Sequence, residues 1–470
     1  MLFSSVTFLY WFFIVVIALY FIAPMPKGST AIRNAVLLVT SLVFYAWGEP
    51  VYVLLMLAQC VSGWFFGLLI DKFRGKPTSK VFLVASLVVG FGGLMVFKYS
   101  DFFIGAINSV SGAGFDLWKL ALPLGISFYT FQILSYTIDL YRGNAKLQRN
   151  LLTFSTYVVL FPPLIAGPII RYTDIEKELK SRTHSVEQFS KGAFRFVIGL
   201  GKKVLIANVL GELAEICRNS SEQSVLFAWL YAVAYALHIY FDFSGYSDMA
   251  IGMGHIFGFK FLENFNYPYI SKSITEFWRR WHISLSTWFR DYVYIPLGGN
   301  RVKPLRQVFN ILVVWFLTGF WHGAGWNFIL WGGYFGVLLL LEKFVFGNFL
   351  KKLPSVISHV YVMLIVIISW VFFDGYTLSA SVATLSQMFG IGATSLAGNE
   401  SLYYLRSYAV PLILGVIGCT PIVKFAAVKL RDRFVTFSVA AQPLITAGAL
   451  ILVTAYLVDG SFNPFIYFRF

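Results

Sequence analysis

Charged residues are scarce in this chain of 470 residues: Asp, Glu, Lys and Arg make up 13% of it, whereas soluble domains carry about 25%. Hydrophobic residues make up 58%, and so few charges cannot cover the surface of a soluble protein of this size. The same composition excludes intrinsic disorder and a coiled coil. The chain is therefore typical of a membrane protein, in which apolar side chains face lipid.

Several sequence signatures of known chemistry are also missing. The three cysteines, Cys60, Cys217 and Cys419, lie far apart and form no CxxC pair, so we expect no bound metal and no disulfide framework. The chain has no P-loop, which argues against an ATP-driven pump, and it has no GxSxG elbow or HExxH zinc pair. Few acidic residues interrupt the apolar stretches, which argues against a proton- or sodium-coupled transporter.

The chain contains about thirteen apolar stretches whose lengths approach that needed to span a bilayer. Basic loops alternate with nearly neutral ones, so the positive-inside rule predicts that both termini are extracytoplasmic. This orientation requires an even number of crossings, and the proline-interrupted stretch 151–170 is the candidate for a re-entrant segment. We expect an all-α polytopic membrane protein that forms a single domain over residues 1–470, with about 10–12 transmembrane helices plus re-entrant and interfacial helices.

The net charge of +15 has three possible explanations: nucleic acid, anionic lipid facing positive-inside loops, or an anionic substrate. Basic residues are spread over many loops, so we expect no nucleic-acid partner. Residues 242–306 hold a dense group of charges, and within them residues 273–292 have apolar and aromatic side chains at helical spacing. This pattern predicts an amphipathic helix that lies at the inner membrane interface, with Ser273 and Glu276 as its capping box.

Two histidines are the candidate site residues. His282 lies near the edge of the aromatic stripe, beside Arg279 and Arg290, where it marks either a lipid-anchoring helix or an inner-leaflet site for an anionic ligand. His322 is expected at the turn of a helical hairpin, deep in the membrane. A neutral imidazole there accepts a proton near neutral pH, and the alternative role for His322 is a structural hydrogen bond to a neighbouring helix.

The residues around both histidines resemble the signature of membrane-bound O-acyltransferases. The longest matching run is ITEFWRRWHISLSTW at 274–288, and Trp321-His322-Gly323 is the second. Supporting runs cover most of the chain in order; they are FYAW at 44–47, LGISFYTF at 124–131, AGP at 166–168 and YFDFSGYSDMA at 240–250. Within the family, the chain resembles the alginate O-acetyltransferase membrane subunit and its peptidoglycan- and other polysaccharide-acetylating relatives.

This resemblance implies a function and a place in the cell. It implies that His322 is the catalytic base, that His282 is a second catalytic residue, and that the helices form a ring around a thin, funnel-shaped core. It also implies acetyl-CoA as a cytoplasmic donor substrate without a permanently bound cofactor, an extracytoplasmic SGNH-type O-acetyltransferase as partner, and a location in the bacterial inner membrane. From charge alone, we predict that the donor phosphates are attracted by five basic residues: Arg279, Arg280, Arg290, Lys202 and Lys203.

The C-terminal tail, residues 460–470, contains Phe465-Ile466-Tyr467 and ends in Phe470. This motif is similar to the end of a small companion protein of D-alanyl transfer to teichoic acids, in which a tyrosine is thought to receive the acyl group. That similarity implies that Tyr467 is an acyl acceptor or carrier outside the cytoplasm. The alternative is a short aromatic anchor at the outer interface.

Three other functions remain open from the sequence. The first is direct acylation of a lipid-linked or protein acceptor, the second is transport of an anionic metabolite, and the third is a structural scaffold for a polysaccharide synthase. Membrane lipids are partners in each case.

Overall fold

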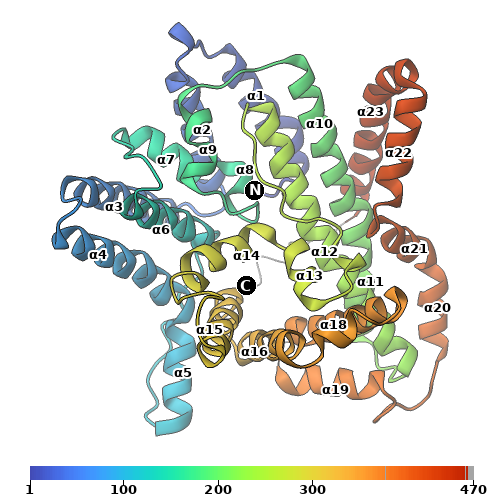
Figure 1. Ribbon diagram of the computed structural model, residues 1–470. Helices are drawn as coiled ribbons and strands as arrows, with labels where there is room; N and C mark the ends of the chain where they lie inside the picture. The colour runs from blue at the N-terminus through green and yellow to red at the C-terminus, as the bar shows by residue number, and fades with distance from the viewer. Residues whose placement is uncertain (376, 461, 464–470) are drawn as a thin grey trace. The chain divides into compact units, whose positions relative to one another are not determined.

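The computed structural model describes residues 1–375, 377–460 and 462–463 (Figure 1). The chain divides into two compact units. The first unit consists of residues 1–196 and 249–263, and the second consists of residues 197–248 and 264–470. Within the described residues there is no β-strand, and an isolated β-bridge joins Ser224 and Ser395.

The first unit is built from short and medium-length helices. These are α1 (Phe13–Ile22), α2 (Ala31–Ala46), α3 (Tyr52–Lys72), α4 (Pro77–Leu94), α5 (Ser100–Ser111), α6 (Ile126–Arg142), α7 (Leu151–Val159), α8 (Phe161–Leu164), α9 (Tyr172–Lys180) and most of α10 (Val186–Gly201). Two π-helical turns, η1 (Phe8–Phe12) and η3 (Met95–Tyr99), and the 3₁₀ turn η2 (Pro26–Gly28) complete it.

The second unit carries the remaining helices. These are α11 (Val209–Asn219), most of α12 (Val225–Ile256), α13 (Ile274–Arg280), α14 (Ile283–Phe289), α15 (Pro304–His322), α16 (Trp326–Leu341), α17 (Gly347–Leu350), α18 (Ser355–Asp374), α19 (Leu378–Met388), α20 (Asn399–Ser407), α21 (Ala409–Gly418), α22 (Ile422–Arg433) and α23 (Val435–Asp459). Its π-helical turns are η4 (Lys202–Asn208), η6 (Arg290–Tyr294) and η7 (Glu342–Phe346), and η5 (Pro268–Ile270) is a 3₁₀ turn.

The prediction of an all-α polytopic membrane protein is confirmed. In the described part of the chain, six helical segments are long and apolar enough to cross a membrane, or seven if α20 and α21, which meet at a 58° bend, form one span. This number is smaller than the predicted 10–12, because several apolar stretches are divided into shorter helices. The stretch 151–170 is one of them: it contains only α7 and α8, which a break at Leu160 separates.

In the first unit, α6 is a central helix with all but three of its 17 residues buried. Helices α3 and α4 lie beside it (Figure 1). The packing depends on small residues: a methyl group on Gly63 would lie 2.4 Å from Cγ2 of Ile133. Because polar backbone groups are already paired within each helix, such close packing of helices supplies the remaining stability in an apolar environment.

A buried arginine joins several elements of the first unit. Arg182 is 3% exposed, and it donates from Nε to Tyr20 Oη at 3.1 Å and from Nη1 to Asn34 Oδ1 at 2.7 Å. The Tyr20 hydroxyl in turn donates to the backbone carbonyl of Phe257 at 2.8 Å. These bonds connect α1, α2 and the segment after α9 to the end of α12. A buried charge is tolerated here because hydrogen bonds replace part of its hydration.

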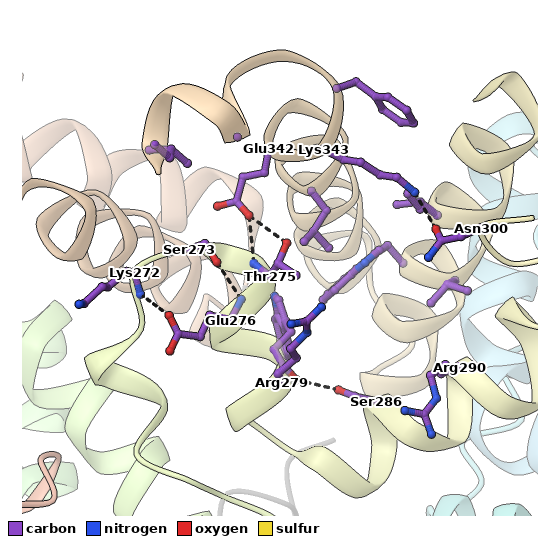
Figure 2. Close-up of a pocket in the computed structure, with 18 of the residues that line it drawn as sticks. Lys272, Ser273, Thr275, Glu276, Arg279, Ser286, Arg290, Asn300, Glu342 and Lys343 are labelled. Carbon is purple, nitrogen blue, oxygen red and sulfur yellow. Dashed lines mark hydrogen bonds between the residues drawn. The ribbon is translucent and has the colours of Figure 1, made fainter. Parts of the chain in front are cut away.

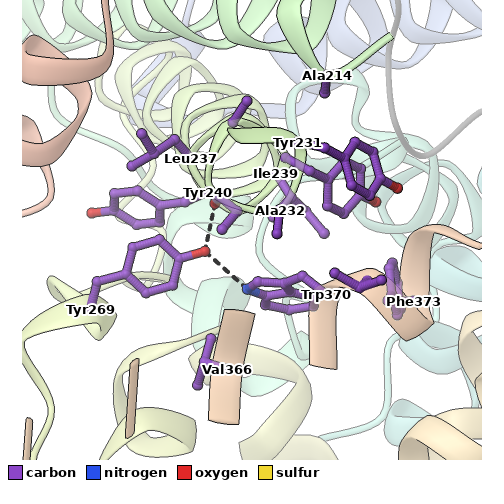
Figure 3. Close-up of a cluster of buried hydrophobic side chains, with 14 of the residues drawn as sticks. Ala214, Tyr231, Ala232, Leu237, Ile239, Tyr240, Tyr269, Val366, Trp370 and Phe373 are labelled. Atoms are coloured by element: carbon purple, nitrogen blue, oxygen red, sulfur yellow. Dashed lines mark hydrogen bonds between the residues drawn. The ribbon is translucent and has the colours of Figure 1, made fainter. Parts of the chain in front are cut away.

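In the second unit, the core is aromatic and surrounds α12. Tyr269 donates its hydroxyl proton to the carbonyl of Ala236 in α12 at 2.6 Å and accepts from Nε1 of Trp370 in α18 at 3.0 Å (Figure 3). Both aromatic residues are at most 4% exposed. The two hydrogen bonds satisfy the polar ends of both rings, so these large side chains are buried without an unpaired donor.

Helices α15 and α16 form a hairpin whose backbones approach closely. A methyl group added to Gly332 would lie 2.3 Å from the carbonyl oxygen of Trp315 and 3.1 Å from Cα of Gly319. In contrast, a methyl group on the neighbouring Gly333 would have nothing within 4 Å. The hairpin therefore depends on the absence of a side chain at one face of α16.

We predict that Gly332→Ala lowers the melting temperature of the purified protein and costs about 2 kcal/mol of stability, since overpacking of a tight contact typically costs 1–3 kcal/mol. Gly333→Ala is the matched control, and it is expected to leave the melting temperature unchanged or to raise it slightly, because alanine favours the helix over glycine. Equal melting temperatures for the two variants would contradict the close approach.

Candidate functional site

The predicted helix 273–292 is interrupted in the structure. Helix α13 ends at Arg280, α14 begins at Ile283, and His282 between them has a left-handed backbone with φ of 44°. Half of the predicted capping box is present, because Ser273 Oγ accepts from Glu276 N at 3.0 Å. The Glu276 carboxylate does not return to Ser273; it accepts from the backbone N–H of Lys272 at 3.0 Å. The prediction of one continuous amphipathic helix was wrong, since a single left-handed residue changes the chain direction without disturbing the apolar spacing on either side.

The aromatic stripe of this segment packs into the protein. Phe277, Trp278, Trp281 and Trp288 are each at most 8% exposed. Trp278 contacts Trp315 of α15 with ring centroids 4.7 Å apart. The aromatic spacing in the sequence therefore indicates a core contact of the second unit.

His282 is itself buried, with 1% of its surface exposed. Its Nδ1 lies 3.2 Å from Oδ1 of Asn264, and its ring packs edge-on against Phe243 at 4.6 Å between centroids. Nε2 is buried and has no hydrogen-bond partner among the described residues. Burial lowers the pKa of His282 below its ordinary value, because the charged form is poorly solvated, so the ring is neutral at neutral pH.

His322 is the last residue of α15, at the turn of the hairpin, and is 7% exposed. Aromatic rings surround it: the centroids of Trp321, Trp331 and Phe373 lie 4.9, 5.2 and 5.3 Å from that of the imidazole. Trp321 also contacts His282, with centroids 6.1 Å apart. The indole ring of Trp321 therefore contacts both candidate histidines.

A cavity of about 990 Å³ opens beside α13 and the α15–α16 hairpin (Figure 2). We call it the basic cavity, because five cationic side chains line it: Lys272, Arg279, Arg290, Lys343 and Lys351. His282 lines it as well, whereas His322 is not among its lining residues. Such a cavity is large enough for a sizeable anionic ligand.

The two carboxylates that line the basic cavity are both engaged. Glu342 accepts from the backbone N–H of Ile274 at 2.6 Å. It also accepts from both the backbone N–H and the hydroxyl of Thr275 at 3.0 Å, as Figure 2 shows. Glu276 pairs with Arg280 at 2.9 Å. Glu342 thus caps the start of α13 and holds it against η7, while the lining keeps an excess of positive charge.

The structure separates the five basic residues that were predicted to attract phosphates. Arg279 and Arg290 line the basic cavity. Arg279 has no carboxylate within ion-pair distance in the described residues, whereas Arg290 pairs with Asp291 at 2.7 Å. Arg280 is held by Glu276 and by the carbonyl of Asn266 at 3.0 Å.

The two lysines lie elsewhere in the second unit. Lys202 pairs with Asp248 at 2.7 Å, and Lys203 pairs with Asp242 at 2.6 Å in a bridge that is almost fully buried. The structure therefore brings Arg279 and Arg290 together with His282, and it brings none of Arg280, Lys202 and Lys203 to the cavity lining. The functional roles of all five residues stay predictions.

Sequence reasoning missed Asn264, Glu342 and the cavity-lining role of Lys343 and Lys351. Asn264 lies 18 positions before His282, in an irregular segment with no periodic pattern that would connect the two. Lys343 and Lys351 lie among the basic residues from which the positive-inside rule predicts the orientation of the loops. Nothing in a local sequence pattern distinguishes a lipid-facing lysine from one that faces a cavity.

Tyr467 lies outside the described residues, so its predicted role is not addressed by the geometry. The last described residue, Asn463, accepts a hydrogen bond at its Oδ1 from Nδ2 of Asn208 in η4 at 3.1 Å. Phe462 lies close to α11: a methyl group on Gly211 would be 3.2 Å from its ring and 2.7 Å from that of His238. The end of the described chain is therefore bound to the second unit, which also holds both histidines.

Comparisons with known proteins point to one family. Residues 148–381 match the sequence model of the membrane-bound O-acyltransferase family. The probable alginate O-acetylase AlgI of Azotobacter vinelandii is 38% identical, with 100% of both chains covered. The protein of the same name from Pseudomonas aeruginosa is 42% identical over 84% of this chain and 76% of its own. A peptidoglycan O-acetyltransferase of Helicobacter pylori is 33% identical over 84% of this chain and 81% of its own.

Proposed function

Because this chain belongs to the membrane-bound O-acyltransferase family and is a multi-pass membrane acyltransferase, we propose that it exports acetyl groups for polysaccharide acetylation. In this proposal it lies in the bacterial inner membrane with both termini extracytoplasmic. It takes acetyl from cytoplasmic acetyl-CoA and passes it across the membrane for O-acetylation of a cell-surface or exported polysaccharide. The relatives named as alginate O-acetylases and as a peptidoglycan O-acetyltransferase support the acceptor class.

The basic cavity is the observation that carries this proposal. It combines several cationic side chains with a histidine, His282, which contacts Trp321 beside His322. The diphosphate and phosphate of acetyl-CoA match such a lining, since guanidinium forks bind phosphate oxygens and lysines supply further positive charge. Arg280, Lys202 and Lys203 are left out of the proposed donor site, because they do not line the cavity and each pairs with a carboxylate.

In the proposed reaction, His322 acts as general base. It removes the proton of an acceptor hydroxyl, and the oxygen attacks the thioester carbonyl to form a tetrahedral intermediate. The intermediate collapses by breaking the carbon–sulfur bond. The departing thiolate is then protonated by the imidazolium of His322, which returns to its neutral form. The products are an acetyl ester and free CoA, and no acyl bond to the histidine is required.

The proposed first acceptor is Tyr467, whose phenol oxygen carries acetyl as an ester until an extracytoplasmic SGNH-type transferase passes it to a sugar hydroxyl. The hydrogen bond between Asn208 and Asn463 supports this step, because it binds the chain four residues before Tyr467 to the unit that contains His322. The direct acylation of a lipid-linked or protein acceptor is the competing enzymatic reaction.

We predict that His322→Ala abolishes acetylation, with a loss of about 10²–10⁴-fold in the rate of acetyl transfer, as expected for removal of a general base. The measurement is transfer of radiolabelled acetyl from acetyl-CoA by the purified protein, together with acetyl content of the polysaccharide in cells. His255→Gln, which changes a half-buried histidine of the first unit, is the control and is expected to retain activity. Near-normal acetylation by folded His322→Ala protein would contradict the proposal, and an intact thioester in the wild-type reaction would favour a transporter.

We predict that Arg279→Gln raises the KM for acetyl-CoA by about tenfold, because a charge-assisted hydrogen bond contributes about 1.5–3 kcal/mol. Arg280→Gln is the matched control: it removes the same charge from the neighbouring position, which faces Glu276 rather than the cavity, and is expected to change KM by less than about twofold. Equal effects of the two substitutions would show that the cavity is not the phosphate site.

We predict that mass spectrometry of the C-terminal peptide finds acetyl on Tyr467 in protein that has been supplied with acetyl-CoA. Tyr467→Phe removes the acceptor oxygen and is expected to stop polysaccharide acetylation in cells. An active Tyr467→Phe variant would exclude the carrier role, while leaving the donor site and His322 untouched.

A further inference from the structure

Asn264 is a buried polar side chain near the candidate site that makes several hydrogen bonds. It is 0% exposed, and its Oδ1 lies 2.8 Å from Oγ of Ser284, 3.2 Å from the backbone N of Ser284 and 3.2 Å from Nδ1 of His282. Its Nδ2 donates to Oγ of Ser247 in α12 at 3.2 Å. Both ends of the amide are therefore satisfied in a fully buried position, which fixes its orientation.

The contacts of Asn264 determine where the proton of His282 lies. A backbone N–H only donates, so the Asn264 atom that faces Ser284 N must be the oxygen and not the amide nitrogen. The imidazole Nδ1 contacts the same oxygen at 3.2 Å, and a contact with an acceptor requires that Nδ1 carry the hydrogen. The hydroxyl of Ser284 also lies 3.5 Å from Nδ1, but it donates its own hydrogen to Asn264 Oδ1 at 2.8 Å. In a neutral imidazole the second nitrogen then has no hydrogen, so Nε2 is an acceptor.

This acceptor has no partner within the described protein. Nε2 of His282 is buried, and the histidine lines the basic cavity. A buried acceptor without a hydrogen bond is unfavourable, and a ligand that supplies a donor recovers this cost on binding. Because His282 lines the cavity, a bound ligand with an N–H or O–H that reaches Nε2 would satisfy this acceptor.

The proposed donor substrate carries such a group close to its reacting bond. In a CoA thioester, an amide N–H lies two carbon atoms from the sulfur, whereas the thioester itself has no hydrogen-bond donor. His322, the proposed base, does not line the cavity. We therefore expect a donor whose phosphates bind the basic residues to contact His282 with the arm that links its phosphates to the thioester. The thioester carbonyl, at the end of this arm, then reaches His322.

We propose that Asn264 is a positioning residue that holds His282 with its proton on Nδ1, so that Nε2 accepts a hydrogen bond from the amide N–H nearest the thioester of the acyl donor. This inference rests on the proposed use of acetyl-CoA. It assigns His282 to recognition of the donor arm, and it assigns Asn264, Ser284 and Ser247 to the orientation of that histidine.

The test compares acetyl-CoA with an analogue in which an ester oxygen replaces this amide N–H. The analogue keeps the shape of the arm but presents a lone pair to Nε2 where the amide presents a hydrogen. The purified full-length protein is expected to prefer the amide by about tenfold or more in kcat/KM, since a site built for a hydrogen-bond donor rejects an analogue that lacks it. In Asn264→Leu the imidazole is no longer oriented, and the preference is expected to fall to within about twofold of unity.

Two further variants separate orientation from general damage. Asn264→Asp keeps an oxygen for Ser284 and for Nδ1, and it is expected to restore most of the preference. If Asn264→Leu does not yield folded protein, His282→Asn carries the test, because asparagine tolerates the left-handed backbone and retracts the acceptor from the cavity.

Several outcomes of this comparison would overturn the inference. Equal use of amide and ester by the wild-type protein, or an unchanged preference in both Asn264→Leu and His282→Asn, overturns the inference. A fall in kcat with an unchanged preference also overturns it, because it assigns His282 to chemistry instead of donor recognition. A wild-type protein that transfers no acetyl from acetyl-CoA contradicts the proposed function and, with it, this inference.

Discussion

The hydrogen bonds that Asn264 makes across the break at His282 hold together the segment on which the site depends. A left-handed residue between α13 and α14 deprives the first N–H groups of α14 of helical acceptors. Asn264 replaces them: its backbone carbonyl accepts from Ile283 N at 3.0 Å, and its side chain accepts from Ser284 N. Because the break is buried, these hydrogen bonds satisfy backbone N–H groups that would otherwise lack a helical partner, and they stabilise the turn at His282.

Charge pairing decides which of the basic residues are available to a ligand. In a chain with so few acids, each carboxylate of the second unit that lies beside a cation removes that cation from the set that can bind an anion. Asp242, Glu276 and Asp291 do this for Lys203, Arg280 and Arg290, respectively. Glu342 instead caps α13 with backbone bonds and leaves Arg279 and Lys343 facing the cavity. The excess positive charge of the basic cavity thus depends on which cations the carboxylates pair with, as well as on where the basic residues lie.

The sequence predicted the class of fold and the position of His322 at a hairpin turn, because both depend on local signals. Apolar stretches of spanning length predict helices in a membrane, and a histidine at the end of an apolar run before glycines predicts a hairpin turn at His322. The break at His282 was not predictable from periodicity, since the aromatic spacing continues through it. Nor was Asn264, whose role comes from a contact across 18 residues, nor the difference between Arg279 and Arg280, which depends on the direction of each side chain.

The relation between the two histidines follows from the aromatic residues that surround them. His282 lines the basic cavity, His322 does not, and Trp321 contacts both rings. Trp331 and Phe373 also pack against His322, so aromatic rings make up much of its surroundings. In the proposed reaction, a thioester bound among these rings is shielded from water, which protects it from hydrolysis and strengthens its hydrogen bonds. The proposed recognition of the donor at His282 and the proposed proton transfer at His322 are therefore separable tasks, as the proposal of a cytoplasmic donor and an extracytoplasmic acceptor requires.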